Sequence, residues 1–280
     1  MDISPKKDLS RYLYEDIKNG DITSALLSNK NIKAKIISRE RGIVAGVKFA
    51  RNIFQLKKCT VRTFIKDGSR LKPNQTILEV SGSTKSILSC ERTVLNLLSR
   101  MSGIATQTNY LVLQIKKYNK KIDLYSTRKT APGLRYFDKE AVRIGGGHKH
   151  RMSLDDMIML KDNHLLLCNS MGDIIKKARK KHKQVEVEVE NQRDAVLAAK
   201  YGATIVMLDN FSPVQIKKTI IALQKKKLRN KIKLEASGGI NSKNIGAYAK
   251  TGVDIISVGS VTNSVTGLDL SLEVCPPQKK

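Results

Sequence analysis

Several features are scarce in this 280-residue chain, and each scarcity narrows the class of protein. Tryptophan is absent and aromatic residues make up only 5% of the sequence, so stacking platforms for single-stranded nucleic acid are poorly supplied. No apolar run approaches the roughly 18–20 residues that span a bilayer. The N-terminal sequence MDISPKKDLS lacks the apolar segment of a signal peptide. We therefore expect a cytoplasmic protein without a membrane partner.

Cysteine is also rare. The four cysteines are far apart and form no CxxC pair: Cys59, Cys90, Cys168 and Cys275. This spacing argues against both a zinc site and a disulfide framework.

Acidic residues are few relative to basic ones, 25 against 52, which gives a formal net charge of +27. A basic surface that binds nucleic acid or membrane is one explanation. The other is a general enrichment in lysine, with only a minority of the charge directed at an anionic substrate. The lysine clusters fall on polar faces or ends of predicted helices, without interleaved aromatic residues, as at Lys116-Lys117 and Lys180-Lys181. This favours the second explanation, and no specific nucleic-acid partner is expected.

The stretch from residue 127 to residue 164 is rich in cationic side chains. It contains Arg128, Lys129, Arg135, Lys139, Arg143, His148, His150, Arg151, Lys161 and His164, together with the glycine run Gly145–Gly147. A glycine triplet suits neither a helix interior nor a strand interior, so it predicts a loop whose backbone closely approaches another group. Arginine grips carboxylates and phosphates through paired hydrogen bonds. The stretch predicts a pocket for a small, multiply anionic substrate; a solvated charged face is the alternative.

The first part of the chain predicts a mixed helix and strand domain. Leu9–Ile17 has helical spacing, and 32–80 contains short alternating runs separated by glycine and proline, as strands and turns require. A long helix is predicted from about Thr84 to Tyr118, with a possible break at Ser102-Gly103. Residues 1–118 are therefore expected to combine helices with short strands and turns.

After Lys121 the pattern alternates between strand and helix. The predicted strands are Ile122–Ser126, Met157–Lys161, Val185–Glu190, Thr204–Leu208, Lys233–Ala236 and Asp254–Val258, with helices such as Asn191–Tyr201, Pro213–Lys226 and Ser242–Thr251 between them. Such alternation implies a parallel sheet with right-handed crossovers. Repeated six or more times, it suggests a closed or nearly closed barrel.

Polar residues stand at the carboxyl end of every predicted strand, where barrel enzymes place their chemistry. They are Thr127-Arg128-Lys129, Lys161-Asp162-Asn163-His164, Glu188-Val189-Glu190, Asp209-Asn210, Ser237-Gly238-Gly239 and Gly259-Ser260. This coincidence across six strands is the strongest functional signal in the chain.

The run VEVEVE places three carboxylates, Glu186, Glu188 and Glu190, on one face of a strand. If the valines face the helices, all three carboxylates point into the barrel and need lysine, arginine or a metal as a partner. An edge strand with a wet face is the alternative.

Two glycine-bearing loops follow successive strands. The segment Ser237–Ile240 leads toward a helix whose expected N-cap is Asn241, and Val258–Ser260 follows the next strand. Backbone N–H groups presented in this way form the usual phosphate site of such barrels, and simple structural turns are the alternative.

These motifs together resemble the quinolinate phosphoribosyltransferase family. The resemblance is carried by EDIKNGDIT (15–23), ERTVLNLLSRMSGIAT (91–106), TRKTAPGLR (127–135), GGGHKHR (145–151), KDNH (161–164), EVEVE, MLDN (207–210), EASGGI and ISVGSVTNS. It implies an α/β sandwich domain over residues 1–118, with the C-terminal tail 266–280 packing back on it, and an incomplete (β/α) barrel of six to seven parallel strands over residues 119–265. It also implies a homodimer in which each site is capped by the partner's sandwich domain.

The resemblance also implies residue roles. Quinolinate would be held by Arg92 from the other subunit and by Thr127, Arg128, Lys129, His150, Arg151 and Lys161. Phosphoribosyl pyrophosphate would be bound by Lys129, Lys161, Glu188, Asp209, Ser237, Gly238, Gly239, Val258, Gly259 and Ser260, with Mg²⁺ on Glu188 and Asp209. One departure stands out: family members commonly have His where this chain has Asn263.

Three alternatives stay open. A molybdenum-locus relative of the family shares TRKT and the HR pair but acts on a different base. A phosphate-binding barrel lyase or aldolase would use Lys161 as a Schiff-base amine. A nucleic-acid-binding module would show affinity for unrelated duplexes that falls steeply with salt.

Overall fold

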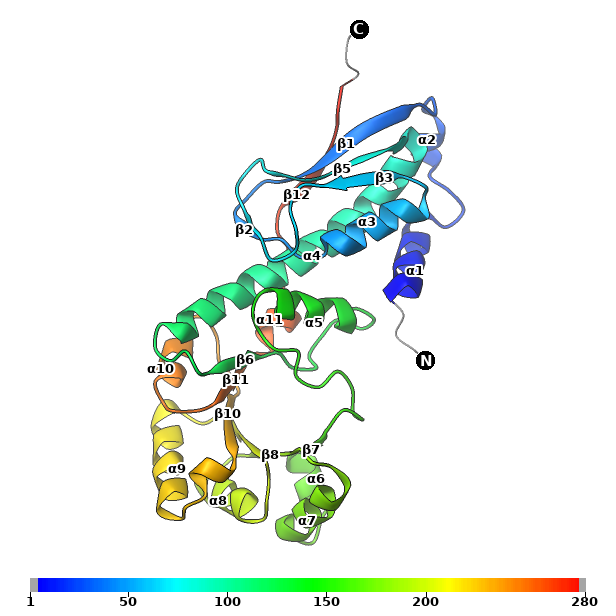
Figure 1. Cartoon of the computed structure of the whole chain (residues 1–280). Coiled ribbons are helices and arrows are strands. Elements are labelled where there is room, and N and C mark those ends of the chain that lie inside the picture. The colour runs from blue at the N-terminus through cyan, green and yellow to red at the C-terminus, as the bar shows by residue number, and fades with distance from the viewer. Residues whose placement is uncertain (1–4, 277–280) are drawn as a thin grey trace. The chain divides into compact units, whose positions relative to one another are not determined.

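The computed structural model describes residues 5–276, which divide into two compact units (Figure 1). Unit 1 contains the residues up to Asn109, the segment Pro132–Gly145 and the residues from Ser264; unit 2 contains Tyr110–Ala131 and Gly146–Asn263. Residues 1–4 and 277–280, which belong to the predicted sandwich domain and tail, lie outside the described residues. Within the described part, no helix is both long and apolar enough to cross a membrane.

Unit 1 is built on an antiparallel sheet in the order β12-β1-β5-β3. Its strands are β1 (Asn31–Ser38), β3 (Thr60–Thr63), β5 (Thr76–Ser83) and β12 (Leu270–Val274), with a separate pair β2 (Gly42–Ile43) and β4 (Arg70–Leu71). Its helices are α1 (Pro5–Ile17), α2 (Ile22–Ala25), α3 (Val47–Leu56), most of α4 (Thr84–Lys116) and α5 (Arg135–Ile144). The C-terminal strand β12 pairs with β1, Leu272 lying opposite Ile36.

The core of unit 1 is apolar, with aromatic rings packed edge to face. The rings of Phe49 and Phe137 are 5.0 Å apart at an interplanar angle of 82°, and Tyr12 packs against Phe137 at 5.8 Å. Asp138 and Lys139 are charged residues that are also fully buried in this unit, and Asp138 accepts two hydrogen bonds from Arg100 at 2.7 and 2.8 Å. Burial of these rings stabilises the unit by about 2–3 kcal/mol each.

The predicted break in the long helix at Ser102-Gly103 is wrong: α4 runs without interruption from Thr84 to Lys116. Both residues serve packing. The buried Ser102 hydroxyl accepts a hydrogen bond from the Ala45 backbone N–H at 3.0 Å. At Gly103 a Cβ atom would lie 2.0 Å from the carbonyl oxygen of Thr266, so only glycine lets that chain segment pass.

Unit 2 is a parallel six-stranded sheet in the order β6-β11-β10-β9-β8-β7. The strands are β6 (Asp123–Tyr125), β7 (Ile158–Leu160), β8 (Val185–Val189), β9 (Ile205–Asp209), β10 (Lys233–Ser237) and β11 (Ile255–Ser257). The connecting helices are α6 (Asp162–Leu166), α7 (Met171–Lys181), α8 (Gln192–Lys200), α9 (Pro213–Lys225), the 3-10 turn η1 (Arg229–Lys231), α10 (Ile245–Ala249) and α11 (Ser260–Asn263). The six predicted strands are confirmed, and with them the predicted class of a sandwich domain and an incomplete barrel.

Local sequence explains where the helices of unit 2 begin. The side chain of Asn191 accepts the Asp194 N–H and starts α8, while Ser212 forms a capping box with Gln215 and starts α9. The predicted helix 242–251 is shorter than expected, since α10 begins only at Ile245. The predicted N-cap Asn241 is also wrong: its side chain accepts the Lys243 N–H within a turn.

The register of unit 2 determines which side chains share a face of the sheet. Glu186 lies opposite Ile205 and Met159, Glu188 lies opposite Met207, and Asp209 lies opposite Ser237. Because paired residues point to the same side of a sheet, all of these face one way. The other face carries Val185, Val187, Val189, Val206, Leu208, Leu234 and Ala236, all buried, and α8 contacts β8 and β9. The alternative of a wet edge strand at VEVEVE is therefore excluded.

Candidate active site

The carboxyl ends of the six parallel strands bring the predicted residues into one ordered row. Along the sheet from β6 to β7 the residues that follow or end the strands are Thr127–Lys129, Val258–Ser260, Ser237–Gly239, Asp209, Glu188 and Lys161. The two candidate phosphate loops are thus neighbours, and the two candidate metal-binding carboxylates are neighbours. This order follows from the strand topology, which the sequence alone did not specify.

Glu188 and Asp209 stand on adjacent strands. Lys161 at the end of β7 is bound to Glu188, with the ammonium nitrogen 2.5 Å from Oε2. Asp209 accepts a hydrogen bond from the side-chain amide of Asn210 at 2.7 Å. Two neighbouring carboxylates with free oxygen lone pairs suit a hard cation such as Mg²⁺. The ion pair also occupies the Lys161 amine, which argues against its use as a Schiff-base nucleophile.

Glu190 does not join this group. The strand β8 ends at Val189, and Glu190 is exposed in the following bend. The expectation that all three glutamates of VEVEVE point inward is therefore correct for Glu186 and Glu188 and wrong for Glu190, because the alternation stops where the strand stops.

The loop after β10 has the backbone conformation expected where another group comes close to the main chain. Gly238 and Gly239 have positive φ angles of +88° and +61°, and a Cβ on Gly238 would lie 2.2 Å from the side-chain oxygen of Asn210. The loop is therefore packed against the residue that follows Asp209. It does not sit at a helix N-terminus as predicted, because α10 begins only after Asn244.

The loop after β11 contacts the segment after β6. The Thr262 hydroxyl donates to the Lys129 carbonyl at 2.8 Å, and a Cβ on Gly259 would lie 3.2 Å from Cδ of Lys129. The Lys129 backbone N–H in turn donates to the Thr127 hydroxyl at 3.1 Å. The lysine side chain therefore lies over Gly259, where its amine can serve an anion bound at either loop.

Arg128 and Arg151 are close enough to influence each other. Burial lowers the pKa of the Arg151 guanidinium, and the positive charge of Arg128 lowers it further. Arg151 is only 8% exposed, and Nε of Arg128 is buried without a hydrogen-bond partner. The buried Arg151 guanidinium therefore lies near the partly buried Arg128, and a pair of this kind suits an anion with two carboxylates.

His150 lies beside Arg151 but points into the sheet interior. Its Nε2 is 3.0 Å from Oε2 of Glu186, and its ring centroid is 5.5 Å from that of Tyr125. The His150 backbone has φ +51°, a conformation that costs a non-glycine residue about 1–2 kcal/mol. Such strain persists only where the surroundings enforce it, so the histidine is held in place from the interior.

Glu235 was not assigned a role from the sequence. It is fully buried on β10, and neither of its carboxylate oxygens has a hydrogen-bond partner. Burial, together with the negative charge of Glu186, raises its pKa well above the ordinary value. The signal that could have revealed it is its position two residues before Ser237, which gives it the same inward orientation.

Some of the basic residues in 127–164 do not join the row. Arg135, Lys139 and Arg143 lie on α5 and belong to unit 1. Lys139 is fully buried there, and Arg143 is bound to Glu140. Gly145, the first glycine of the triplet, also belongs to unit 1, and a Cβ on it would lie 2.5 Å from the Ala105 carbonyl oxygen; the group that Gly145 approaches is helix α4, not a substrate.

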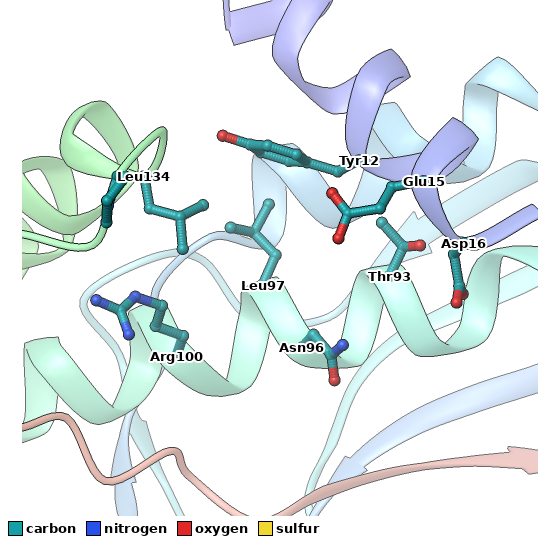
Figure 2. Close-up of a pocket in the computed structure, with 9 residues that line it drawn as sticks. Tyr12, Glu15, Asp16, Thr93, Asn96, Leu97, Arg100 and Leu134 are labelled. Carbon is teal, nitrogen blue, oxygen red and sulfur yellow. The ribbon is translucent and has the colours of Figure 1, made fainter.

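Arg92, predicted to act in the other subunit, is exposed on α4 of unit 1. The next residue, Thr93, lines a cavity of about 440 Å³ between α1 and α4. Figure 2 shows Tyr12, Glu15 and Asp16 of α1 facing Asn96 and Arg100 of α4 across this cavity. Apolar residues such as Leu97 and Leu134 also line the cavity, so its lining is mixed.

Comparisons with known proteins agree with this geometry. Residues 21–102 match the quinolinate phosphoribosyl transferase N-terminal domain, and residues 104–273 match the C-terminal domain of the same family. The chain is 44% identical over 264 residues to a probable nicotinate-nucleotide pyrophosphorylase (carboxylating) of Methanothermobacter thermautotrophicus, covering 92% of this chain and 95% of the relative. It is 40% identical to the Bacillus subtilis protein of the same name, covering 96% and 93%.

Among solved structures, the nicotinate-nucleotide pyrophosphorylase from Francisella tularensis superposes with a TM-score of 0.90 at 41% identity, covering 97% of this chain and 96% of that one. Both family domains match, and each of these relatives is covered over more than nine-tenths of its length. The chain therefore belongs to the quinolinate phosphoribosyltransferase family.

Proposed function

We propose that this protein transfers a phosphoribosyl group from phosphoribosyl pyrophosphate to quinolinate and releases pyrophosphate and carbon dioxide, giving nicotinate mononucleotide for NAD synthesis. The observation that carries the proposal is the ordered row at the carboxyl ends of the unit 2 strands. Arg128, Lys129 and Lys161, the carboxylates for a metal–diphosphate and two loops for a phosphate all lie at strand ends of one sheet, and Arg151 lies close to Arg128.

Quinolinate binding is assigned to the desolvated guanidinium groups of Arg128 and Arg151. A pyridine dicarboxylate supplies the two negative charges that these neighbours lack. Lys129 and Lys161 stand at the ends of the row and complete the cationic set, and the side chain of His150 contributes from beside Arg151. Thr127 positions the Lys129 backbone through its hydroxyl.

Phosphoribosyl pyrophosphate is assigned to the remaining positions. Its 5′-phosphate would accept hydrogen bonds from the loops at Ser237–Gly239 and Val258–Ser260. Glu188 and Asp209 would hold Mg²⁺, which supplies neutralisation of the departing pyrophosphate when it is bound. The donor set fits that ion, because both are carboxylates on adjacent strands. Asn263 lies in α11 directly after the second loop and replaces the usual histidine with a neutral amide.

The residues present are those that such a reaction needs. The bond from C1 of the ribose to the pyrophosphate oxygen breaks through an oxocarbenium-like state, and the pyridine nitrogen forms the new bond. The protein therefore mainly positions two anions and stabilises charge. The ring nitrogen, now positive, draws the electrons of the adjacent carbon–carboxylate bond; carbon dioxide leaves and a proton takes its place. No serine or cysteine nucleophile is required.

The test of the reaction is an assay with quinolinate carrying a labelled 2-carboxylate. Release of labelled carbon dioxide should require phosphoribosyl pyrophosphate, and nicotinate mononucleotide should appear in equal amount. Base-dependent pyrophosphate release without carbon dioxide would instead favour a relative that acts on another base.

We further propose a homodimer in which Arg92 reaches the partner's site. Support comes from the exposure of Arg92 on α4 and from the family's capping arrangement. Mixing an Arg92→Ala variant with an Arg151→Ala variant should restore activity, because each mixed dimer then contains one intact site. Random exchange predicts about a quarter of the wild-type activity; no recovery after verified subunit exchange would place Arg92 outside the partner's site.

A further inference from the structure

A cluster of one histidine and two glutamates lies on the inward face of the unit 2 sheet, apart from the row of strand-end residues. His150, Glu186 and Glu235 each offer one ligand atom, and these atoms all lie within 4.8 Å of one another. They come from three separate parts of the chain: the segment before β7, strand β8 and strand β10. Both glutamates are fully buried, so this is not a solvated acidic patch.

The carboxylates in this group are poorly satisfied by the protein. Oε2 of Glu186 is bound to His150, but its Oε1 and both oxygens of Glu235 have no hydrogen-bond partner and are sealed from solvent. Among the described residues, no ion pair joins either glutamate to Arg128, Arg151 or Lys161. A buried carboxylate without a partner costs several kcal/mol, so a cation bound between these two glutamates would relieve that cost.

We propose that His150, Glu186 and Glu235 bind a divalent first-row transition-metal ion inside unit 2, separate from the Mg²⁺ proposed at Glu188 and Asp209. One imidazole and two carboxylates are the ligands of Mn²⁺, Fe²⁺ or Zn²⁺, and two carboxylate charges neutralise a dication. Metal–ligand bonds of about 2.0–2.2 Å hold ligand atoms closer together than the 4.8 Å limit found here, so the three side chains would draw together around the ion.

The proposed metal site is reached from solvent, and an ion bound there would stabilise the local backbone. A cavity of about 520 Å³ at the amino-terminal ends of the strands is lined by His150 together with Tyr125, Met157, Gln184 and Thr204. An ion on Nε2 would hold the strained His150 backbone and leave Nδ1 free toward the substrate. The ion would thus stabilise the backbone at His150 and Arg151. This role is separate from the phosphoribosyl transfer itself.

The experiment uses the full chain, freed of metal by EDTA, without either substrate. Mn²⁺ is titrated in and the free ion is counted by electron paramagnetic resonance; one tight site per chain is expected. Glu235→Gln should weaken this site on the order of 100-fold or more, because even changing an outer partner of a ligand costs about 10- to 100-fold. The matched control Glu188→Gln, on the same strand as Glu186, should retain it.

The absence of a stoichiometric Mn²⁺ site in the wild type would overturn the proposal. So would a Glu235→Gln variant that binds Mn²⁺ as tightly as the wild type, or Glu235→Gln and Glu188→Gln variants that lose Mn²⁺ affinity to the same extent. Should Glu235→Gln fail to fold, pulsed electron paramagnetic resonance of the wild-type Mn²⁺ form decides. Coupling to one imidazole nitrogen is expected from His150, and a signal without nitrogen coupling contradicts it. Because no substrate is present, these outcomes are independent of whether the enzyme decarboxylates quinolinate.

Discussion

The two units handle buried charge in opposite ways. The interior of unit 1 is filled by apolar and aromatic side chains, and its buried Asp138 is fully paired with Arg100. The inward face of the unit 2 sheet instead carries Glu186 and Glu235 with carboxylate oxygens that have no hydrogen-bond partner, and Nε of Arg128, after β6, is likewise buried without one. Complete pairing serves stability, whereas incomplete pairing is tolerated where a ligand supplies the missing partner. The difference assigns the chemistry to unit 2 from structure alone.

The largest expected effect is on stability and falls in unit 1. Phe137→Ala removes a fully buried ring that contacts both Phe49 and Tyr12. The free energy of unfolding should fall by about 3–5 kcal/mol, measured by urea denaturation. A loss below about 1 kcal/mol would contradict the view of unit 1 as a tightly packed scaffold.

The next effect is on substrate binding and falls in unit 2. Arg128→Ala and Arg151→Ala should each reduce kcat/KM for quinolinate roughly 30- to 150-fold, mainly through KM, because a hydrogen bond to a charged group contributes about 2–3 kcal/mol when the partner is left unpaired. Steady-state kinetics measure this, and Arg193→Ala on the exposed face of α8 is the control. Near-normal quinolinate KM in both variants would remove them from the carboxylate clamp.

A smaller effect distinguishes two adjacent glycines in the loop after β10. Gly238→Ala should raise the KM for phosphoribosyl pyrophosphate roughly tenfold, because its Cβ collides with Asn210 and displaces the loop, in addition to the αL cost of about 1–2 kcal/mol. In Gly239→Ala the new Cβ has nothing within 4 Å, so only the conformational cost of the αL backbone applies. Equal KM values in the two variants would show that the loop does not need its contact with Asn210.

The smallest effect is a pH dependence in unit 1. Asp67 accepts the backbone N–H groups of Gly46 and Val47 at 2.8 and 2.9 Å, but burial outweighs these bonds and raises its pKa. The native state therefore binds more protons than the unfolded state above about pH 3.8, and stability falls as the pH rises from there through the raised pKa. Urea titrations across this window should show that Asp67→Asn reduces the decline, while the exposed control Asp269→Asn does not.

The sequence predicted much of unit 2 because its signals are local. Apolar strands, the caps at Asn191 and Ser212 and the polar residues after each strand all depend on neighbours in the chain. The order of the strands, which makes Glu188 adjacent to Asp209, depends on topology and became visible only in the structure.

What the sequence did not predict involves contacts between distant segments. Gly103 was interpreted as a helix breaker, but it is required because the Thr266 backbone lies against it. Gly145 was interpreted as part of a substrate loop, but the group it approaches is Ala105. Glu235 was overlooked because a single acid in an apolar strand has no periodic signal, whereas Glu186 and Glu188 do. The residue roles taken from the family resemblance stay predictions until a ligand is bound.

The most direct measurement of the central claim is a crystal structure of the protein with a pyridine dicarboxylate bound. We expect one carboxylate or both within hydrogen-bond distance of the Arg128 and Arg151 guanidinium groups, at the carboxyl ends of the unit 2 strands. A well-ordered dicarboxylate bound elsewhere, with both guanidinium groups free of it, would contradict the assignment of this row as the active site.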